Sequence, residues 1–473
     1  MKLVIFDYFV IICYGALILF IGFIIARNKE KGSSGAVQFI LAGRRLSLPL
    51  FVATLVSTWY GNILGVGEFV YTNGISAWVC WGLPYYIAAV IFALYFAKKI
   101  RNLNVTTIAE QVSRKFGNRA GFLASVIVLL ITIPAPYILM TGVILQIFFG
   151  WDLWICIVLG SVLSTAYIFT GGFKADVFAN VAQFLLMYIG FAVLLIFTVL
   201  KFGTYGVLSG NLPNSHLTLA GNHSWQFIAS WYIIALQTFI DPGFHQRCSA
   251  AKTPKIASRG ILISVILWGV FDFFTLTTGL YAKAFFSLKQ PMMAYISLAD
   301  SVLPAVWKGL FIAAMLAPIM SALNGYAFVS GATIGQDIIP RILGKRQDDK
   351  SITFYLRIGI LITSLVGIIM ALALPSPVEL IYKTASIAVP GLLLPMLLTY
   401  FDKIKITEKK FLILMLASAG ASGLWTIASY LSSHYEFFNY QIFTQFEPLV
   451  PGLLVSVILS MIFVKRGIGN SLN

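Results

Sequence analysis

Apolar runs of about twenty residues recur along the chain, and short polar connections separate them. A run of that length crosses the hydrocarbon core of a bilayer as a helix, since a helix rises about 1.5 Å per residue. The pattern predicts an all-α integral membrane protein with about 13 transmembrane helices. The predicted spans are residues 6–26, 47–70, 75–97, 120–149, 153–170, 175–202, 227–246, 259–285, 302–338, 353–374, 377–401, 410–431 and 446–464. We expect the long ninth span to begin with a separate short helix.

Polar and small residues interrupt the second predicted span. The segment from Ser57 to Glu68 contains three glycines, Asn62 and a carboxylate. Unwound backbone is tolerated at membrane depth where it lines a cavity, so this segment predicts a binding site for an ion or solute. The alternative is a helix whose small residues permit a close helix crossing. The seventh span contains a second break, at Asp241-Pro242-Gly243.

The positions of these two breaks predict the domain organisation. They lie five spans apart, as expected for two five-helix repeats of opposite topology at 47–202 and 203–401. An extra helix and loop, 1–46, precede the repeats, and two helices and a tail, 402–473, follow them.

Prolines predict further bends or interruptions near the middle of other spans. Proline removes a backbone donor and clashes with the preceding turn. We therefore expect interruptions at Pro134 and Pro136 in the fourth span, at Pro318 in the ninth, and at Pro390 and Pro395 in the eleventh.

Basic residues gather in alternate connections. Of the 33 Lys and Arg residues, 27 fall on one predicted side, Arg247 among them, while the connections 203–226 and 432–445 have none. Positive charge marks the cytoplasmic side, so the protein should be a multi-pass protein of the plasma membrane with its N-terminus outside and its C-terminus in the cytoplasm. The net charge of +16 then reflects orientation and not nucleic-acid binding. The expected partners are a small-molecule solute and the lipid bilayer, with no obligate protein partner.

The composition adds no sign of an enzyme. The residues are 59% hydrophobic and 11% charged, and the mean hydropathy is +0.89. The four cysteines are scattered, and the four histidines have no partner at a spacing typical of a metal site or a nucleophilic triad. We expect no catalytic residue and no cofactor, apart from Na⁺ as a coupling ion.

Four motifs resemble those of the sodium:solute symporter family. They are A-G-R-R-L at 42–46, G-G-F-K-A-D-V-F-A-N-V-A-Q at 171–183, P-G-F-H-Q-R-C-S-A-A-K-T-P-K-I-A-S-R-G at 242–260, and A-P-I-M-S-A-L at 317–323. With the pattern of spans, the resemblance covers essentially the whole chain. It implies a LeuT-like core of two inverted five-helix repeats. It also implies secondary active uptake of a small polar or anionic solute, coupled to sodium by alternating access.

The resemblance also implies where sodium binds. The backbone carbonyls of Ser57 and Tyr60, the carbonyl of Pro318 and the hydroxyl of Ser321 would coordinate the ion. Hard oxygen ligands of this kind suit sodium, and unwound backbone supplies them without burying a carboxylate.

Two positions depart from the family pattern at this site. Ala322 follows Ser321 where many members carry a second hydroxyl, and Asn180 stands where many carry an aspartate. Losing a buried ligand without replacement costs about 1–3 kcal/mol, so sodium would bind roughly tenfold more weakly or worse. The alternative is a proton-coupled or sodium-independent transporter on the same fold, using Glu68 or Asp272.

Other polar residues within the spans are candidates for solute binding or gating. Trp59, Asn62, Gln237 and Asp241 lie at or beside the two breaks and either bind the solute or make ordinary helix contacts. Asp272 either serves in transport or hydrogen-bonds to a neighbouring helix.

Lys383, within the eleventh span, has two possible partners. It pairs either with Glu379, one turn earlier on its own helix, or with Glu68 across an outer vestibule. In the second case it would act as an external gate or as a receptor for a substrate carboxylate.

Overall fold

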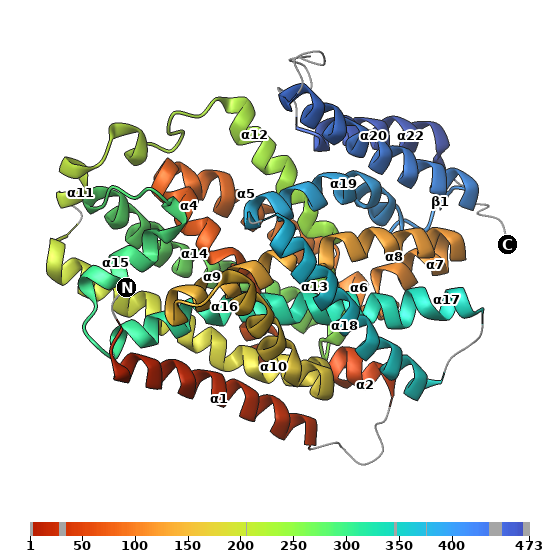
Figure 1. Ribbon diagram of the computed structural model, residues 1–473. Helices are drawn as coiled ribbons and strands as arrows, with labels where there is room; N and C mark the ends of the chain where they lie inside the picture. The colour runs from red at the N-terminus through yellow and green to blue at the C-terminus, as the bar shows by residue number, and fades with distance from the viewer. Residues whose placement is uncertain are drawn as a thin grey trace.

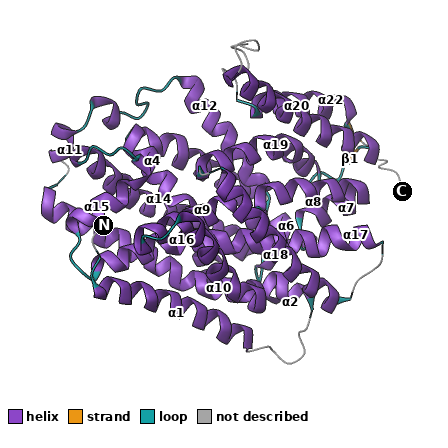
Figure 2. Cartoon of the chain, in the orientation of Figure 1, coloured by secondary structure: helices purple, strands orange, loops and turns teal. Residues whose placement is uncertain are grey.

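The computed structural model describes residues 3–27, 35–204, 206–344, 348–374, 376–434 and 447–466. This part of the chain is almost entirely helical (Figures 1 and 2). The only sheet in this part of the chain is a two-stranded antiparallel pair, β1 (Ile404–Lys405) with β2 (Lys465–Arg466).

The elements of the first half precede the external connection. They are α1 (Ile5–Arg27), α2 (Ala36–Leu41), η1 (Ala42–Arg44), α3 (Leu48–Trp59), η2 (Tyr60–Asn62), α4 (Ile63–Asn73), η3 (Trp78–Gly82), α5 (Leu83–Tyr95), α6 (Ala97–Leu103), α7 (Ile108–Phe116), α8 (Asn118–Thr132), α9 (Ala135–Phe149) and α10 (Leu153–Phe202).

The elements of the second half begin with two short segments of that connection. They are α11 (Gly206–Asn211), η4 (Asn214–Leu217), α12 (Trp225–Ile234), η5 (Ala235–Ile240), α13 (Pro242–Ala250), α14 (Pro254–Phe285), η6 (Pro291–Met293), α15 (Ala294–Val302), α16 (Trp307–Ala332), η7 (Thr333–Ile338), α17 (Ile339–Leu343), α18 (Asp349–Ala373), α19 (Pro377–Leu398), α20 (Glu408–His434) and α22 (Leu449–Phe463).

Nine helical segments in the described residues are long and apolar enough to cross a membrane, and two shorter apolar helices accompany them. One of the nine, α10, corresponds to two predicted spans. The broken segment from α12 to α13 is not among the nine and corresponds to the predicted span 227–246. The multi-pass, all-α prediction is therefore confirmed, while the exact count of spans and the domain boundaries stay predictions. The separate short helix expected before the ninth span is α15.

The two breaks lie where the sequence predicts them. Between α3 and α4 the chain makes one 3₁₀ turn, η2, which ends at Asn62 with φ −93° and ψ 39°. Between η5 and α13 it passes through Asp241 in extended conformation, with φ −65° and ψ 116°. Glycine and polar residues weaken the first helix, and the following proline ends the second.

The fourth span is also interrupted as predicted. Helix α8 ends at Thr132 and α9 begins at Ala135, with Ile133 extended between them. The residue before a proline avoids the helical region, which explains the position of this break.

The interruptions predicted at Pro318, Pro390 and Pro395 are wrong. Pro318 lies inside the continuous helix α16, and the other two lie inside α19. A proline removes one helical hydrogen bond, and helices packed on several sides keep their course past it. Helix α16 is such a case, since 89% of the residues in its apolar, membrane-crossing stretch are buried inside the protein.

Helix α10 has a sharp kink at Gly172, between the fifth and sixth predicted spans. Gly172 has φ 62° and ψ −158°, and a Cβ there would overlap the ring and carbonyl of Phe39. Positive φ and close approach both require glycine. The kink separates the two predicted spans.

Helix α16 runs through the middle of the bundle, packed against α3, α9, α10 and α18 (Figure 1). Helix α1 packs along α10 and α16, and α20 and α22 lie side by side against α19 at one edge. The first break therefore lies against a buried central helix, which sets the position of the site.

Candidate functional site

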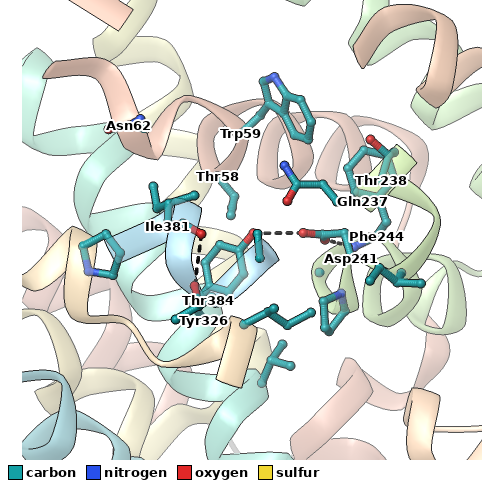
Figure 3. A pocket seen from close by; sticks show the side chains of 18 of the residues that line it. Thr58, Trp59, Asn62, Gln237, Thr238, Asp241, Phe244, Tyr326, Ile381 and Thr384 are labelled. Atoms are coloured by element: carbon teal, nitrogen blue, oxygen red, sulfur yellow. Dashed lines mark hydrogen bonds between the residues drawn. The ribbon is translucent and has the colours of Figure 1, made fainter. Parts of the chain in front are cut away.

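A chamber of about 160 Å³ lies beside both helix breaks (Figure 3). The first break contributes Thr58, Trp59 and Asn62 to its wall, and the second contributes Gln237 and Asp241. Helices α8, α9, α16 and α19 close the remaining sides. A concave site with a few polar groups between two broken helices is typical of a solute-binding chamber in a transporter.

Asp241 ties the second break to α16. Its Oδ1 accepts the backbone N–H of Phe244 at 2.9 Å and so caps α13. Its Oδ2 accepts the hydroxyl of Tyr326 at 2.9 Å, as Figure 3 shows. The Tyr326 ring stacks on Tyr137 of α9, with centroids 5.2 Å apart. The carboxylate therefore shapes the chamber through its neighbours.

Aromatic rings beside the first break form another part of the chamber wall. Trp59 stacks on Trp268 at 4.6 Å and meets Tyr85 edge-on at 5.2 Å. Gln237 Nε2 donates to the Tyr85 hydroxyl at 2.5 Å. Trp59 and Gln237 thus both line the chamber, and they offer a solute an aromatic face and an amide oxygen; their role in solute binding stays a prediction.

The predicted sodium site is a cluster of hydroxyls between α3 and α16. Ser57 Oγ and Ser321 Oγ are 3.0 Å apart, and Thr58 Oγ1 is also 3.0 Å from Ser321 Oγ. Pro318 lies one turn before Ser321 on the same buried helix. The carbonyl of Tyr60 belongs to η2, but its phenol points to Asp272. The residues implied by the resemblance are thus neighbours, and their role as sodium ligands stays a prediction.

Arg247 donates into this cluster. Its Nη2 lies 2.7 Å from Thr58 Oγ1, 3.1 Å from Thr54 Oγ1 and 3.3 Å from the Thr54 carbonyl, and its Nη1 is 3.2 Å from the Gly243 carbonyl. The residue is 1% exposed. No carboxylate of the described residues lies within ion-pair distance of the guanidinium. The prediction that Arg247 is one of the cytoplasmic surface charges is therefore wrong, because its side chain turns inward from α13 and is buried.

A hydrogen-bonded chain links Arg247 to Asp176. Asn180 Nδ2 donates to Thr54 Oγ1 at 2.7 Å and to Asp176 Oδ2 at 3.0 Å. Asp176 and Asn180 are both fully buried. The neutral amide of Asn180 therefore lies between the buried acid Asp176 and Thr54, whose hydroxyl also accepts from Arg247.

Gly61 lets α16 approach the first break. A Cβ on Gly61 would overlap the Cβ of Ala322 and lie 2.7 Å from the Tyr137 ring. The methyl group of Ala322 is held by its helix and cannot yield.

We expect Gly61→Ala to lower the apparent melting temperature in detergent, because overpacking costs about 1–3 kcal/mol. Gly269→Ala is the matched control, since no atom lies within 4 Å of its added Cβ. That change should be neutral or slightly stabilising, as alanine favours a helix. Equal melting curves for both variants would contradict the tight contact.

The three other predicted residues differ in their relation to the chamber. Asn62 reaches the chamber wall, but neither its amide nitrogen nor its amide oxygen has a hydrogen-bond partner. Glu68 lies on α4 outside the chamber lining and forms no ion pair with a described side chain. Lys383 lies on α19 beside the lining residues Ile381 and Thr384. A Glu68–Lys383 gate is therefore not closed in this structure. The alternative partner of Lys383 is Glu379, whose side chain lies outside the described residues, so that pairing stays a prediction.

Sequence reasoning missed several site residues. Thr54, Tyr85, Tyr137 and Tyr326 lie in parts of their spans that read as ordinary apolar helix. Arg247 had a detectable signal: it follows the Asp241-Pro242 break by fewer than two helical turns, at a depth where a charge is expensive.

Comparison with known proteins gives a consistent result. A family model described as the sodium:solute symporter family matches residues 39–416. The high-affinity choline transporter 1 of Drosophila melanogaster is 23% identical over 389 residues, which covers 77% of this chain and 62% of that protein's length. The sodium/pantothenate symporter of Escherichia coli (strain K12) is 24% identical over 464 residues, 93% of each chain.

A solved structure shows the same fold. The outward-open, substrate-bound structure of a Na⁺-coupled sialic acid symporter matches with a TM-score of 0.80 at 17% identity, covering 98% of this chain and 99% of that one. The core is therefore LeuT-like, as the family resemblance implies.

Proposed function

Because the chain belongs to the sodium:solute symporter family, and so is a sodium-coupled solute transporter and not an enzyme, we propose that its solute crosses the membrane through the chamber between the two helix breaks. The observation that carries the proposal is that both breaks open on this one cavity, with the hydroxyl cluster of Ser57, Thr58 and Ser321 beside it. Movement of the two repeats around this fixed site gives alternating access.

The coupling ion would bind in that hydroxyl cluster. We place sodium between the carbonyls of Ser57, Tyr60 and Pro318 and the hydroxyl of Ser321. The 3.0 Å approach of Ser57 Oγ to Ser321 Oγ supports this placement, since one small cation can reach both side chains. The guanidinium of Arg247 has to leave Thr58 when sodium arrives, because two positive charges so close repel each other.

The solute is a small polar or anionic molecule on this proposal. Gln237 and Trp59 would contact it, and Asp241 would shape the chamber around it. Arg247 also lines the chamber and supplies a positive charge for an acidic group. Choline and pantothenate, named for the two relatives, differ in charge, so the relatives alone do not select the substrate.

The protein is a multi-pass membrane transporter, and its orientation follows from the distribution of charge. We propose that the N-terminus lies outside and the C-terminus in the cytoplasm of the plasma membrane, since the connections rich in Lys and Arg then face the cytoplasm. Cysteine labelling from each side of intact cells tests this orientation.

The transport proposal is tested in two steps. Thermal-shift screening of the purified protein against sugars, amino acids, organic acids and vitamins, in sodium and in choline chloride, identifies the solute class. Uptake of the best hit into proteoliposomes is then measured with and without an inward sodium gradient. Equal uptake in both salts would contradict sodium coupling and favour the sodium-independent alternative.

We expect Ser321→Ala to weaken sodium binding by roughly tenfold, because one hydroxyl ligand is lost without replacement. The sodium concentration for half-maximal thermal stabilisation measures the effect. Ser330→Ala is the matched control, since Ser330 is buried on the same helix and its hydroxyl bonds to the Ala327 carbonyl. Equal sodium dependence in the two variants would move the ion site away from Ser321.

A further inference from the structure

Two opposite charges line the solute chamber without pairing with each other. Asp241 and Arg247 are the only charged side chains among the lining residues that the structure describes. They form no ion pair with each other. A charge without a partner is costly beside a chamber lined mostly by apolar and aromatic side chains, so this wall favours a ligand that carries both charges.

The space between the two charges is open at Gly243, which also lines the chamber. A Cβ on Gly243 would lie 3.0 Å from Asp241 Oδ1 and 3.0 Å from Arg247 Nη1. These two atoms are therefore separated by no more than twice that distance, and the glycine places no side chain between them. A solute with an ammonium and a carboxylate group on the same carbon can reach Asp241 with one group and Arg247 with the other.

Both charged groups have hydrogen-bonding capacity left for a solute. A carboxylate has about four acceptor positions. The described partners of Asp241 are two, the backbone N–H of Phe244 and the hydroxyl of Tyr326. The guanidinium of Arg247 donates through Nη1 and Nη2, while its Nε has no hydrogen-bond partner. Each group can therefore accept or donate one more charge-assisted hydrogen bond.

Other buried polar atoms in the chamber wall also lack partners. The Thr238 hydroxyl, on a residue that is 1% exposed, has none, and neither amide atom of Asn62 has one, although that residue is only 8% exposed. Buried polar atoms without partners are uncommon, and several of them around one chamber indicate a polar ligand or water. A solute with several donors and acceptors would satisfy them.

The aromatic wall beside the first break, formed by Trp59, Trp81 and Tyr85, offers a surface for the rest of the solute. The described lining has no third charge, so a charged solute side chain would lack a counter-charge, whereas an apolar or aromatic one would pack on the rings. A volume of about 160 Å³ holds on the order of ten water-sized groups, which is the size of an amino acid.

We propose that the solute is an α-amino acid with an uncharged side chain. Its ammonium group binds Asp241, its carboxylate binds Arg247, and its side chain lies against the aromatic wall. This inference rests on the proposed solute chamber and names its substrate class. Sodium at the proposed site strengthens the binding, since displacing Arg247 from Thr58 leaves Nη2 free to donate to the carboxylate.

Matched solutes test this class through the melting temperature of the purified full-length protein in sodium chloride. The panel contains alanine, leucine and phenylalanine, the amide of each, which lacks the carboxylate, and the corresponding acid without the amino group. We expect at least one of the amino acids to bind roughly tenfold more tightly than both of its analogues, because each analogue leaves one buried charge without a partner. Glutamate and lysine should give no comparable shift.

Three results would overturn the proposal. They are the absence of a shift with all three amino acids, an analogue that binds as tightly as its parent amino acid, and an equal shift with glutamate or lysine.

The variant Asp241→Asn tests the role of the carboxylate. Asparagine keeps the helix cap and an acceptor for Tyr326 but loses the charge, so this variant should bind the amino acid and its deaminated analogue about equally well. Asp152→Asn, at an exposed residue before α10, is the control and should keep the full preference. The comparison is made within each variant, so a general loss of stability does not affect it. An unchanged preference in Asp241→Asn would overturn the role of Asp241.

The variant Gly243→Ala tests the open space between the charges. Its methyl group would meet only the ends of two side chains, so the variant should fold, and it should weaken amino-acid binding because the methyl occupies the bridging position. Gly269→Ala, whose added Cβ has no atom within 4 Å, should bind as the wild type does. Equal binding in both variants would place the solute elsewhere.

The outcomes separate this inference from the transport proposal. A solute of another class that stabilises the protein in sodium would overturn the substrate class and leave sodium-coupled transport standing. Equal uptake with and without a sodium gradient would contradict the coupling and leave the preference for amino acids over their analogues unchanged.

Discussion

Replacing Arg247 by methionine is expected to destabilise the folded protein by about 2–4 kcal/mol, because hydrogen bonds from a charged donor contribute more than neutral ones and buried oxygens left without a donor are costly. The guanidinium donates to Thr54, Thr58 and Gly243, and all of these oxygens would lose a partner. Asp176 would remain buried without the nearby positive charge. Thermal unfolding in detergent, followed by tryptophan fluorescence, measures the loss.

Two further variants separate the buried charge from a general effect of losing arginine. Arg114 is a surface residue whose ion pair with Glu110 spans 2.5 Å, and Arg114→Met should change stability by less than about 1 kcal/mol. The double variant Arg247→Met with Asp176→Asn should regain part of the loss, because the orphaned acid becomes neutral. An Arg247→Met protein that melts with the wild type would contradict the buried cluster.

The sequence alone predicts the fold well because helix breaks have local causes. Glycine and asparagine around residue 61, the Asp241-Pro242 pair and the proline after Ile133 each act within one helical turn. Length and hydropathy place the remaining helices. Pro318, Pro390 and Pro395 show the limit of this reasoning, since packing from distant helices decides whether a proline interrupts its own helix.

The site is harder to predict because its contacts join distant segments. Arg247 reaches Thr54 across 193 positions of sequence, and Tyr60 reaches Asp272 across 212. The break before Arg247 is a local signal, but the threonines that receive its guanidinium lie on α3, far away in the sequence. Ser57 and Ser321 were predictable as neighbours through the family resemblance, because shared motifs carry long-range information that local pattern lacks.

The two departures from the family pattern, Ala322 and Asn180, bear on how sodium and Arg247 would share the proposed sodium site. Ala322 supplies no hydroxyl, and its methyl group instead fills the space beside Gly61. Asn180 supplies no charge, so Arg247 is held by neutral oxygens. A cation held only by neutral groups is easier to move than one in an ion pair. On the proposed sodium site, Arg247 would therefore be an internal cation that gives way to sodium.

The second large effect is expected at the other break. Asp241→Ala should destabilise the protein by about 2–4 kcal/mol, since it removes the cap of α13 and leaves the buried Tyr326 hydroxyl without its acceptor. The Tyr326 ring would lose its fixed position against Tyr137, and the chamber would lose its shape. Melting temperature measures the first effect, and the shift induced by the solute identified in the screen measures the second.

Asp241→Asn is the matched control because asparagine caps helices about as well as aspartate and still offers an oxygen to Tyr326. It should keep most of the stability and part of the solute response. Tyr326→Phe removes the same hydrogen bond from the other side, so combining it with Asp241→Ala should cost less than the sum of the two single changes. Strict additivity would mean that the two side chains act separately, and the second break would then be held by its cap alone.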